Sequence, residues 1–302
     1  MSKQGPCYGG LELGGTKTIC LIGSGPEDIR AEARFSTRHP DLTLADCLAF
    51  LRRHHAAQPL TALGIASFGP LDRDPASPGW GRLFKTPKPG WSGVDIVGPF
   101  AEALGIPVII ETDVAGAAYA EGRWGAARGL SHYAYVTVGT GIGGALINEG
   151  RLVQGISHSE LGHIAVPHDR MRDPYEGVCP FHGDCLEGLA SGPAIAARWG
   201  LPAEALPPDH PAFALEAEYL SALALALILI AMPERILWGG GVMQAPQLLP
   251  LLRSRTRERL GGYLPLPPLE DDLASLLAPA GLGARAGPLG ALALAMSHKD
   301  QT

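Results

Sequence analysis

Two stretches of the chain share one pattern: a strand, a glycine-rich turn and a second strand. Residues 8–23, YGGLELGGTKTICLIG, alternate apolar and polar positions, break at two glycines and then resume an apolar run. Residues 132–152, HYAYVTVGTGIGGALINEGRL, repeat this design. Alternation is typical of half-buried strands, and glycines between two such runs favour a hairpin. Because one hairpin lies in each half of the chain, we predict two similar lobes.

The tips of both hairpins are suited to anions. Backbone amides in glycine-rich turns can form an anion-binding concavity, and Lys17 adds an ammonium group to the first tip. Neither tip fits a standard nucleotide motif. Thr16 separates Gly15 from Lys17, which breaks the P-loop spacing, and the second tip is followed by a strand where a dinucleotide fold needs a helix. We expect the hairpins to hold the phosphate chain of one nucleotide from its two ends; an ordinary turn is the alternative for the first.

Bulk composition limits the class of protein. The chain has 302 residues, of which 46% are hydrophobic, enough for two domains with their own cores. Its net charge of −6 argues against a nucleic-acid partner. The N-terminus lacks the apolar core of a signal peptide, and the cysteine spacing does not suit a secreted disulfide framework. The most apolar run, residues 219–232, is shorter than the ~20 residues of a membrane span and is predicted to be a buried helix. These features predict a cytoplasmic protein without a membrane partner.

Between the hairpins and after them, strands alternate with helices. We expect a short strand within residues 62–72 that ends at Gly69-Pro70, and further strands at 106–111 and 235–238. Helices are expected at 42–55 and 94–104, with a polar loop before the first helix and a long loop at 73–91. This alternation is typical of an α/β protein. The last predicted strand ends in Gly239-Gly240-Gly241, which permits close approach of a ligand, although a plain strand-to-helix turn would also use glycines. We place one lobe at residues 1–115 and the other at 116–285, and expect a C-terminal helix at about 286–302 to pack on the first lobe.

Asp113 directly follows one of the buried strands and precedes an alanine-rich stretch predicted to be a helix. A carboxylate at this place is a candidate for chemistry at the end of a strand. The competing interpretation is that Asp113 is only the N-cap of the helix.

Four potential metal ligands lie within one loop-like segment, residues 160–187. Pro and Gly punctuate this segment, so it has no apolar pattern of its own. Its cysteines and histidines have the softness and spacing that tetrahedral Zn²⁺ prefers. We predict a structural zinc site formed by His163, Cys179, His182 and Cys185; incidental cysteines beside surface histidines are the alternative.

In this order, the segments GGTKT, ETDVAGAA, GTGIGG, ELGH, CPFHGDCLE and GGG resemble the ROK family of sugar kinases, which have the actin-like ATPase (ribonuclease H-like) fold with two lobes around a nucleotide and sugar cleft. The resemblance covers nearly the whole chain. His182 within the metal segment, the ETD triplet and FKTPKPGW are similar to the zinc-containing bacterial ROK fructokinases. Ala115 departs from the asparagine often found in these enzymes, so mannose, glucose and N-acetylated aminosugars stay open as substrates.

The resemblance implies a role for each motif. Asp113 would be the general base for the sugar 6-hydroxyl, and Thr112, Glu160, His163 and Glu187 would contact the hexose, expected to be fructose. The nucleotide contacts would come from Gly14, Gly15, Thr16, Lys17, Gly139, Thr140, Gly141, Gly143, Gly239, Gly240 and Gly241. Mg²⁺ would arrive with ATP, and the protein would form a homodimer. A ROK transcriptional regulator is the rival from another class, but the glycine turn begins at Gly14, which leaves no room for a helix-turn-helix before it.

Overall fold

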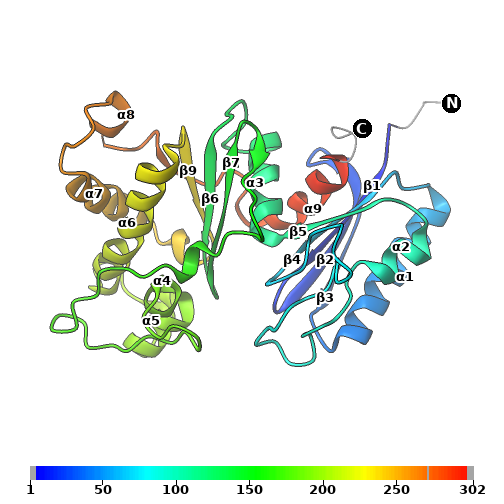
Figure 1. Ribbon diagram of the computed structural model, residues 1–302, viewed down its shortest axis with the longest axis horizontal. Coiled ribbons are helices and arrows are strands. Elements are labelled where there is room, and N and C mark those ends of the chain that lie inside the picture. Colours follow the sequence, from blue (N-terminus) through cyan, green and yellow to red (C-terminus); the bar gives the residue numbers. More distant parts are fainter. Residues whose placement is uncertain (1–4, 271, 298–302) are drawn as a thin grey trace. The chain divides into compact units, whose positions relative to one another are not determined.

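Each half of the chain builds one five-stranded sheet, and the two sheets have the same topology (Figure 1). The computed structural model describes residues 5–270 and 272–297. In the first sheet the strand order is β3-β2-β1-β4-β5, and in the second it is β8-β7-β6-β9-β10. In both sheets the first three strands in sequence are antiparallel, and two later strands add parallel to the first. This repeated topology agrees with the prediction of two similar halves.

The first sheet contains the first predicted hairpin. Its strands are β1 (Tyr8–Leu13), β2 (Lys17–Gly25), β3 (Asp28–Ser36), β4 (Leu63–Ser67) and β5 (Val108–Thr112). The prediction of a polar loop before the first helix was wrong where it covered β3. This edge strand has no fully buried residue, and charged side chains are common on exposed edges, so it carries no apolar signal.

The second sheet contains the second predicted hairpin. Its strands are β6 (Tyr133–Val138), β7 (Ile142–Asn148), β8 (Arg151–Leu152), β9 (Arg235–Gly239) and β10 (Leu277–Pro279). The strand after the glycines, in place of a helix, is confirmed. The sequence did not predict β10, because three residues are too few for a periodic pattern.

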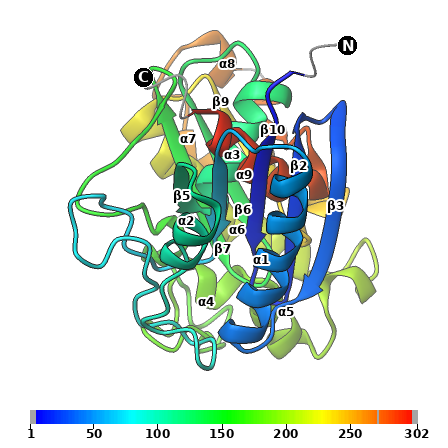
Figure 2. The ribbon, with the colours of Figure 1, turned by 90° about the vertical axis from the view of Figure 1, so that its right-hand side faces the viewer.

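Adjacent glycines in β1 allow helices to pack closely on both faces of the first sheet. A Cβ at Gly9 would lie 3.3 Å from Leu51 of α1 (Pro40–Ala57), and a Cβ at Gly10 would lie 3.0 Å from the backbone of α9 (Ala286–Ser297). Figures 1 and 2 show α1 with α2 (Gly98–Leu104) on one face and α9 on the other. The C-terminal helix is therefore part of the core of the first half; residues 298–302 of its predicted range lie outside the described residues.

Helix α3 (Asp113–Trp124) decides where the first half ends. It packs against α9, and the two helices meet so closely that a Cβ at Gly290 would lie 2.3 Å from the backbone of Gly116. The structure accordingly groups Met1–Arg128, Gln154–His158 and Ala284–Thr302 in unit 1, and Gly129–Val153 with Ser159–Gly283 in unit 2. The first segment of unit 1 thus ends at Arg128, after α3, whereas the sequence placed the boundary after residue 115.

Unit 2 surrounds its sheet with helices of very different polarity. They are α4 (Leu186–Ala190), α5 (Gly192–Trp199), α6 (Ala212–Ala231), α7 (Leu248–Leu260) and α8 (Pro267–Glu270). Helix α6 begins earlier than predicted and has 20 residues, so by length and composition it could cross a membrane, contrary to the estimate from its most apolar run. It packs against α7 and is largely buried in the core of unit 2, but its last turn is exposed at Leu229 and Ile230.

Candidate active site and metal centre

Three parallel strands of unit 1 end in register. Leu13 at the end of β1 pairs with Ser67 of β4, and Ser67 pairs with Thr112 of β5. The first glycine turn therefore leaves the sheet at the same edge as Asp113. Ligands of α/β proteins bind at edges of this kind. The register thus brings together two site elements that are far apart in the sequence.

The backbone N–H groups of the first glycine turn point away from Thr37 and Lys88, which support the turn. Thr37 Oγ1 donates to the carbonyl of Gly14 at 2.7 Å, and the Thr37 amide donates to the carbonyl of Thr16 at 2.9 Å. Lys88 Nζ donates to the carbonyl of Gly15 between them. In a trans peptide unit the N–H points opposite to the C=O. The amides of Gly15, Thr16 and Lys17 therefore point away from these donors, as a phosphate-binding turn requires.

Asp113 is the first residue of α3, and Thr112 is its N-cap. The Thr112 Oγ1 accepts a hydrogen bond from the amide of Ala115 at 3.3 Å, whereas Asp113 Oδ1 accepts one from its neighbour Val114 at 2.9 Å. The interpretation of Asp113 as the N-cap was therefore wrong. Thr112, predicted to contact sugar, uses its hydroxyl oxygen as the cap acceptor.

Glu12 is a candidate site residue that the sequence analysis did not identify. Burial raises the pKa of the Glu12 carboxyl to about 7; Lys17 opposes this shift and Asp113 adds to it. Among the described residues no hydrogen-bond donor reaches its Oε2. A carboxylate inside an otherwise buried strand, directly before a glycine turn, is the signal that could have identified it.

In unit 2 the second hairpin meets the three glycines that follow β9. Strands β6 and β9 run parallel with Thr137 opposite Gly239, so both turns leave the sheet at one edge. Gly240 has a left-handed φ of 93°, and a Cβ there would lie 2.2 Å from the Val138 carbonyl oxygen. A Cβ at Gly139 would lie 3.9 Å from the amide nitrogen of Gly241. The predicted nucleotide positions of unit 2 thus lie in or beside two turns at one sheet edge. Gly139, Thr140 and Gly141 form the turn before β7 and Gly143 is the second residue of β7, whereas Gly239 ends β9 and Gly240 and Gly241 follow it.

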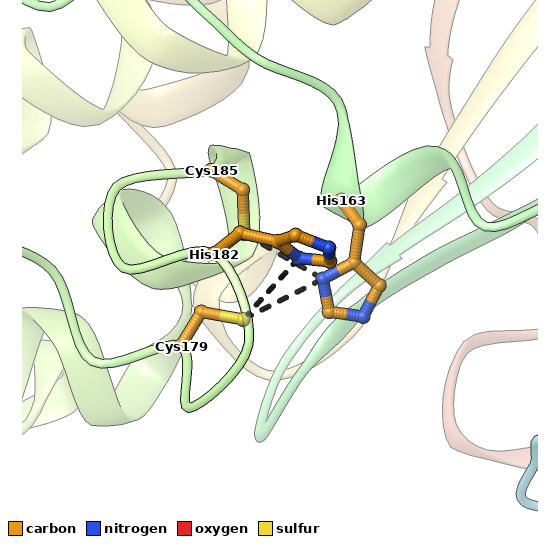
Figure 3. Close-up of side chains that lie close together, drawn as sticks. All are labelled: His163, Cys179, His182 and Cys185. Atoms are coloured by element: carbon orange, nitrogen blue, oxygen red, sulfur yellow. Dashed lines mark hydrogen bonds between the residues drawn. The ribbon is translucent and has the colours of Figure 1, made fainter.

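The four predicted metal ligands converge (Figure 3). One donor atom from each of His163, Cys179, His182 and Cys185 lies within 4.8 Å of the others. His163 Nδ1 is 3.7 Å from the sulfur of Cys179 and 3.5 Å from that of Cys185. The turn between the cysteines closes through Gly183, which has a φ of 63° and donates its amide to the Cys179 carbonyl at 2.9 Å. Two sulfurs and two imidazoles in this arrangement could hold a metal ion that prefers soft, tetrahedral ligands.

Two of the predicted sugar contacts lie beside this metal cluster. His163 Nε2 is 3.9 Å from Glu187 Oε1, and Nδ1 of the same ring points to the cysteines. Glu160 immediately precedes the short helix Leu161–His163, and its carbonyl accepts the His163 amide at 3.0 Å. His163 therefore lies beside Glu187 of α4, and the backbone places Glu160 at the start of the same short helix.

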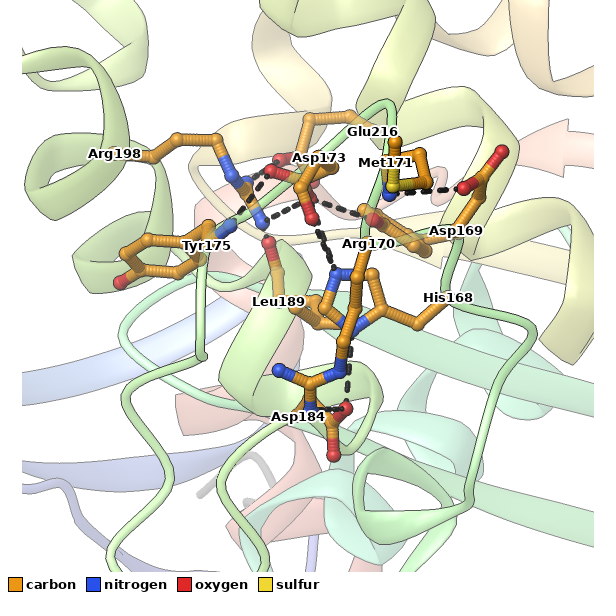
Figure 4. Close-up of polar contacts among 11 residues, drawn as sticks. His168, Asp169, Arg170, Met171, Asp173, Tyr175, Asp184, Leu189, Arg198 and Glu216 are labelled. Atoms are coloured by element: carbon orange, nitrogen blue, oxygen red, sulfur yellow. Dashed lines mark hydrogen bonds and ion pairs between the residues drawn. The ribbon is translucent and has the colours of Figure 1, made fainter.

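The loop between His163 and Cys179 has a second, buried anchor (Figure 4). His168 lies with Nδ1 3.0 Å from Asp184 Oδ2 and Nε2 2.9 Å from the Asp173 carbonyl oxygen. Asp173 also accepts a hydrogen bond from Tyr219 Oη at 2.6 Å and pairs with Arg198 at 3.1 Å. Helices α5 and α6 hold this loop through contacts that include none of the metal ligands.

Glu216 should make stability depend on pH. Burial raises the pKa of this carboxyl from 4.5 to about 8, although Arg198 opposes the shift. Between these values the folded protein retains a proton that the unfolded chain releases, so the free energy of unfolding falls as pH rises through this window. We expect Glu216→Gln to match the parent near pH ~5 and to exceed it by about 2 kcal/mol or more near pH ~9.

Urea unfolding of both proteins at the two pH values measures this difference. Glu204→Gln, at an exposed position of the same unit, controls for the removal of one carboxylate. Parallel pH profiles for the parent and Glu216→Gln would show that Glu216 titrates alike in the folded and unfolded states.

Comparison with known proteins gives the class of this chain. The ROK family model matches residues 8–298. The chain is 41% identical to the fructokinase of Zymomonas mobilis over 100% of both chains, and 41% identical to a putative fructokinase of Bacillus subtilis over 95% of this chain and 94% of that one. The structure of a ROK family glucokinase from Streptomyces griseus, in complex with glucose and AMPPNP, is 25% identical, covers 96% of this chain and 99% of its own, and has a TM-score of 0.76.

The repeated sheets, each with a glycine hairpin, define an actin-like ATPase fold, as the sequence predicted. Within that class the chain belongs to the ROK family.

Proposed function

We propose that the protein is an ATP-dependent hexose kinase that phosphorylates the 6-hydroxyl of D-fructose. The observation that supports this most strongly is 41% identity over the full length of a fructokinase, together with a carboxylate at the sheet edge where the glycine turn begins. Phosphoryl transfer depends mainly on alignment and on charge neutralisation, which two glycine hairpins and a carboxylate can supply.

In the proposed reaction Asp113 accepts the proton of the attacking hydroxyl. Its place at the start of α3 fits this role because the capping task belongs to Thr112. The turn from Gly14 to Lys17 and the second hairpin would hold phosphates through their amides, and the three glycines after β9 would lie against the adenosine. Glu12 fits a magnesium ion, which prefers carboxylate oxygens, because its buried Oε2 has no hydrogen-bond donor among the described residues.

The metal cluster is proposed to hold one structural zinc. Two thiolates and two imidazoles form a complete tetrahedral set, which leaves no position for a reactive water. The bound ion would fix the orientation of His163. That ring could then offer its other nitrogen to the hexose beside Glu187.

The hexose would be bound by Glu160, His163, Glu187 and Thr112. Mannose, glucose and N-acetylated aminosugars are the alternative substrates within the family. We further propose a homodimer and a location in the cytoplasm, where ATP is available.

A coupled assay of ADP release tests the proposal. The purified protein is supplied with Mg·ATP and each hexose of a panel that includes fructose, mannose, glucose and N-acetylmannosamine. We expect fructose to give the highest kcat/KM and the product to be the 6-phosphate. A higher kcat/KM for another hexose would make that hexose the preferred substrate in place of fructose. No turnover with any hexose of the panel would overturn the kinase assignment.

A further inference from the structure

Glu187 lies between the metal cluster and the second glycine hairpin. Its Oε2 accepts a hydrogen bond from the backbone amide of Ile142 at 2.9 Å, and Ile142 is the first residue of β7 after the glycine turn. Its Oε1 lies 3.9 Å from His163 Nε2. One carboxylate therefore contacts the tip of the hairpin with one oxygen and lies beside a metal-ligand histidine with the other.

Gly141 makes this approach possible. A Cβ at position 141 would lie 2.6 Å from Glu187 Oε2, and within 4 Å it would meet only atoms of the Glu187 side chain. The rest of the hairpin tip is tied by backbone hydrogen bonds, from the Gly139 amide to the Gly141 carbonyl at 2.9 Å and from the Gly192 amide to the Gly139 carbonyl at 2.7 Å. The carboxylate of Glu187 thus completes the set of contacts that fixes the turn.

We propose that Glu187 is a positioning residue for the hairpin 139–144 as well as a ligand of the hexose. Through this double role it couples the binding of the hexose to the binding of the nucleotide. This inference rests on the proposed function. Hexose hydroxyls that bind the carboxylate would order its side chain, and the ordered carboxylate would hold the Ile142 amide and the turn around it. A nucleotide that binds next meets a turn whose conformational entropy has already been lost. By linkage, the nucleotide must strengthen hexose binding by the same factor.

The first measurement is the Kd of AMPPNP, by calorimetry, with and without saturating D-fructose. We expect fructose to tighten nucleotide binding by about five-fold or more in the parent. In the absence of sugar, Glu187→Ala should weaken AMPPNP binding by about three- to ten-fold, because the Ile142 amide loses its acceptor. Glu187→Gln keeps an amide oxygen at the same place and should stay within about two-fold of the parent. A residue that served the sugar alone would leave the sugar-free Kd unchanged in both variants.

The second measurement uses two glycine variants of the same hairpin. Gly141→Ala places a methyl group against Glu187 and should displace its carboxylate, so the Kd for fructose measured without nucleotide should rise by about five-fold. Gly139→Ala adds the same methyl group 3.9 Å from its nearest neighbour, the Gly241 amide, and should leave the fructose Kd within about two-fold. Neither glycine has a left-handed φ, so backbone strain does not separate them.

Two results would overturn the coupling. One is an equal sugar-free AMPPNP Kd for Glu187→Ala and Glu187→Gln in folded proteins. The other is an equal fructose Kd for Gly141→Ala and Gly139→Ala. An active parent whose AMPPNP Kd is the same with and without fructose would remove the coupling and leave the kinase in place, whereas a parent that phosphorylates no hexose would remove the proposed function itself.

Discussion

Asp113→Asn is expected to lower kcat by about 10²-fold or more, with the fold intact. The substitution keeps the size of the side chain and an oxygen that can accept the Val114 amide, but it removes the base. Helix α3 should survive, because its N-cap is the Thr112 hydroxyl. Loss of a negative charge from the first turn costs about 0.3–1 kcal/mol of stability, which is small beside the expected loss of rate. Steady-state kinetics with Mg·ATP and fructose, together with urea unfolding, measure both effects.

Asp41→Asn is the matched control for this variant. Asp41 also lies in the first turn of a helix, α1, but it is exposed and belongs to no part of the proposed site. It should lose a similar small amount of stability and keep its kcat. If Asp113→Asn retained activity within about three-fold of the parent, the carboxylate would serve α3 and the base would have to be sought elsewhere.

The sequence predicted the hairpins because their signal is local. Alternating apolar residues and paired glycines fall within one short stretch in each case, and the structure places β1, β2, β6 and β7 there. The same is true of the four metal-ligand candidates, which lie within 23 residues of one chain segment that Pro and Gly mark as a loop.

The elements that the sequence analysis did not predict either have no local apolar pattern or have one that is interrupted by polar residues. Strand β3 is charged and lies at an edge, so its order comes from pairing with β2. Helix α7 is polar over most of its surface, yet Leu248, Leu252, Thr256 and Leu260 recur every four residues and are all buried. That spacing is a helical pattern and could have identified α7.

Residues whose role depends on register were the hardest to find. Burial raises the pKa of the Glu12 carboxyl, Lys17 lowers it and Asp113 raises it further. Asp113 is about a hundred residues away in the chain and reaches the same sheet edge only through the pairing of β1, β4 and β5. Lys88 supports the first glycine turn from the long loop at 73–91, where no periodicity guides a prediction. A single sequence contains these residues but not the distances that give them a function.

Removal of the proposed zinc should harm hexose binding before it harms the fold. Cys179→Ser takes away one of the two thiolates, and the parent should contain near one zinc per chain while the variant contains little. The loop itself should remain in place, because Asp173 stays bonded to Tyr219 and Arg198. His163 would lose the ion that orients its ring, and with it the fixed neighbour of Glu187. Changes to groups that orient a metal-bound histidine typically cost 10–100-fold, so we expect the KM for fructose to rise by about ten-fold or more.

Metal analysis, circular dichroism and kinetics on the parent and on Cys179→Ser measure the three parts of this prediction. Met171→Ser is the control, since Met171 lies in the same loop but is 94% exposed and outside the cluster; it should keep its zinc and its KM. The KM for ATP should change less than the KM for fructose in Cys179→Ser, because the first glycine turn is held by Thr37 and Lys88 in unit 1. Fully active protein that contains no zinc would contradict the metal assignment, and it would also remove the reason to regard His163 as a residue that the metal orients toward the sugar.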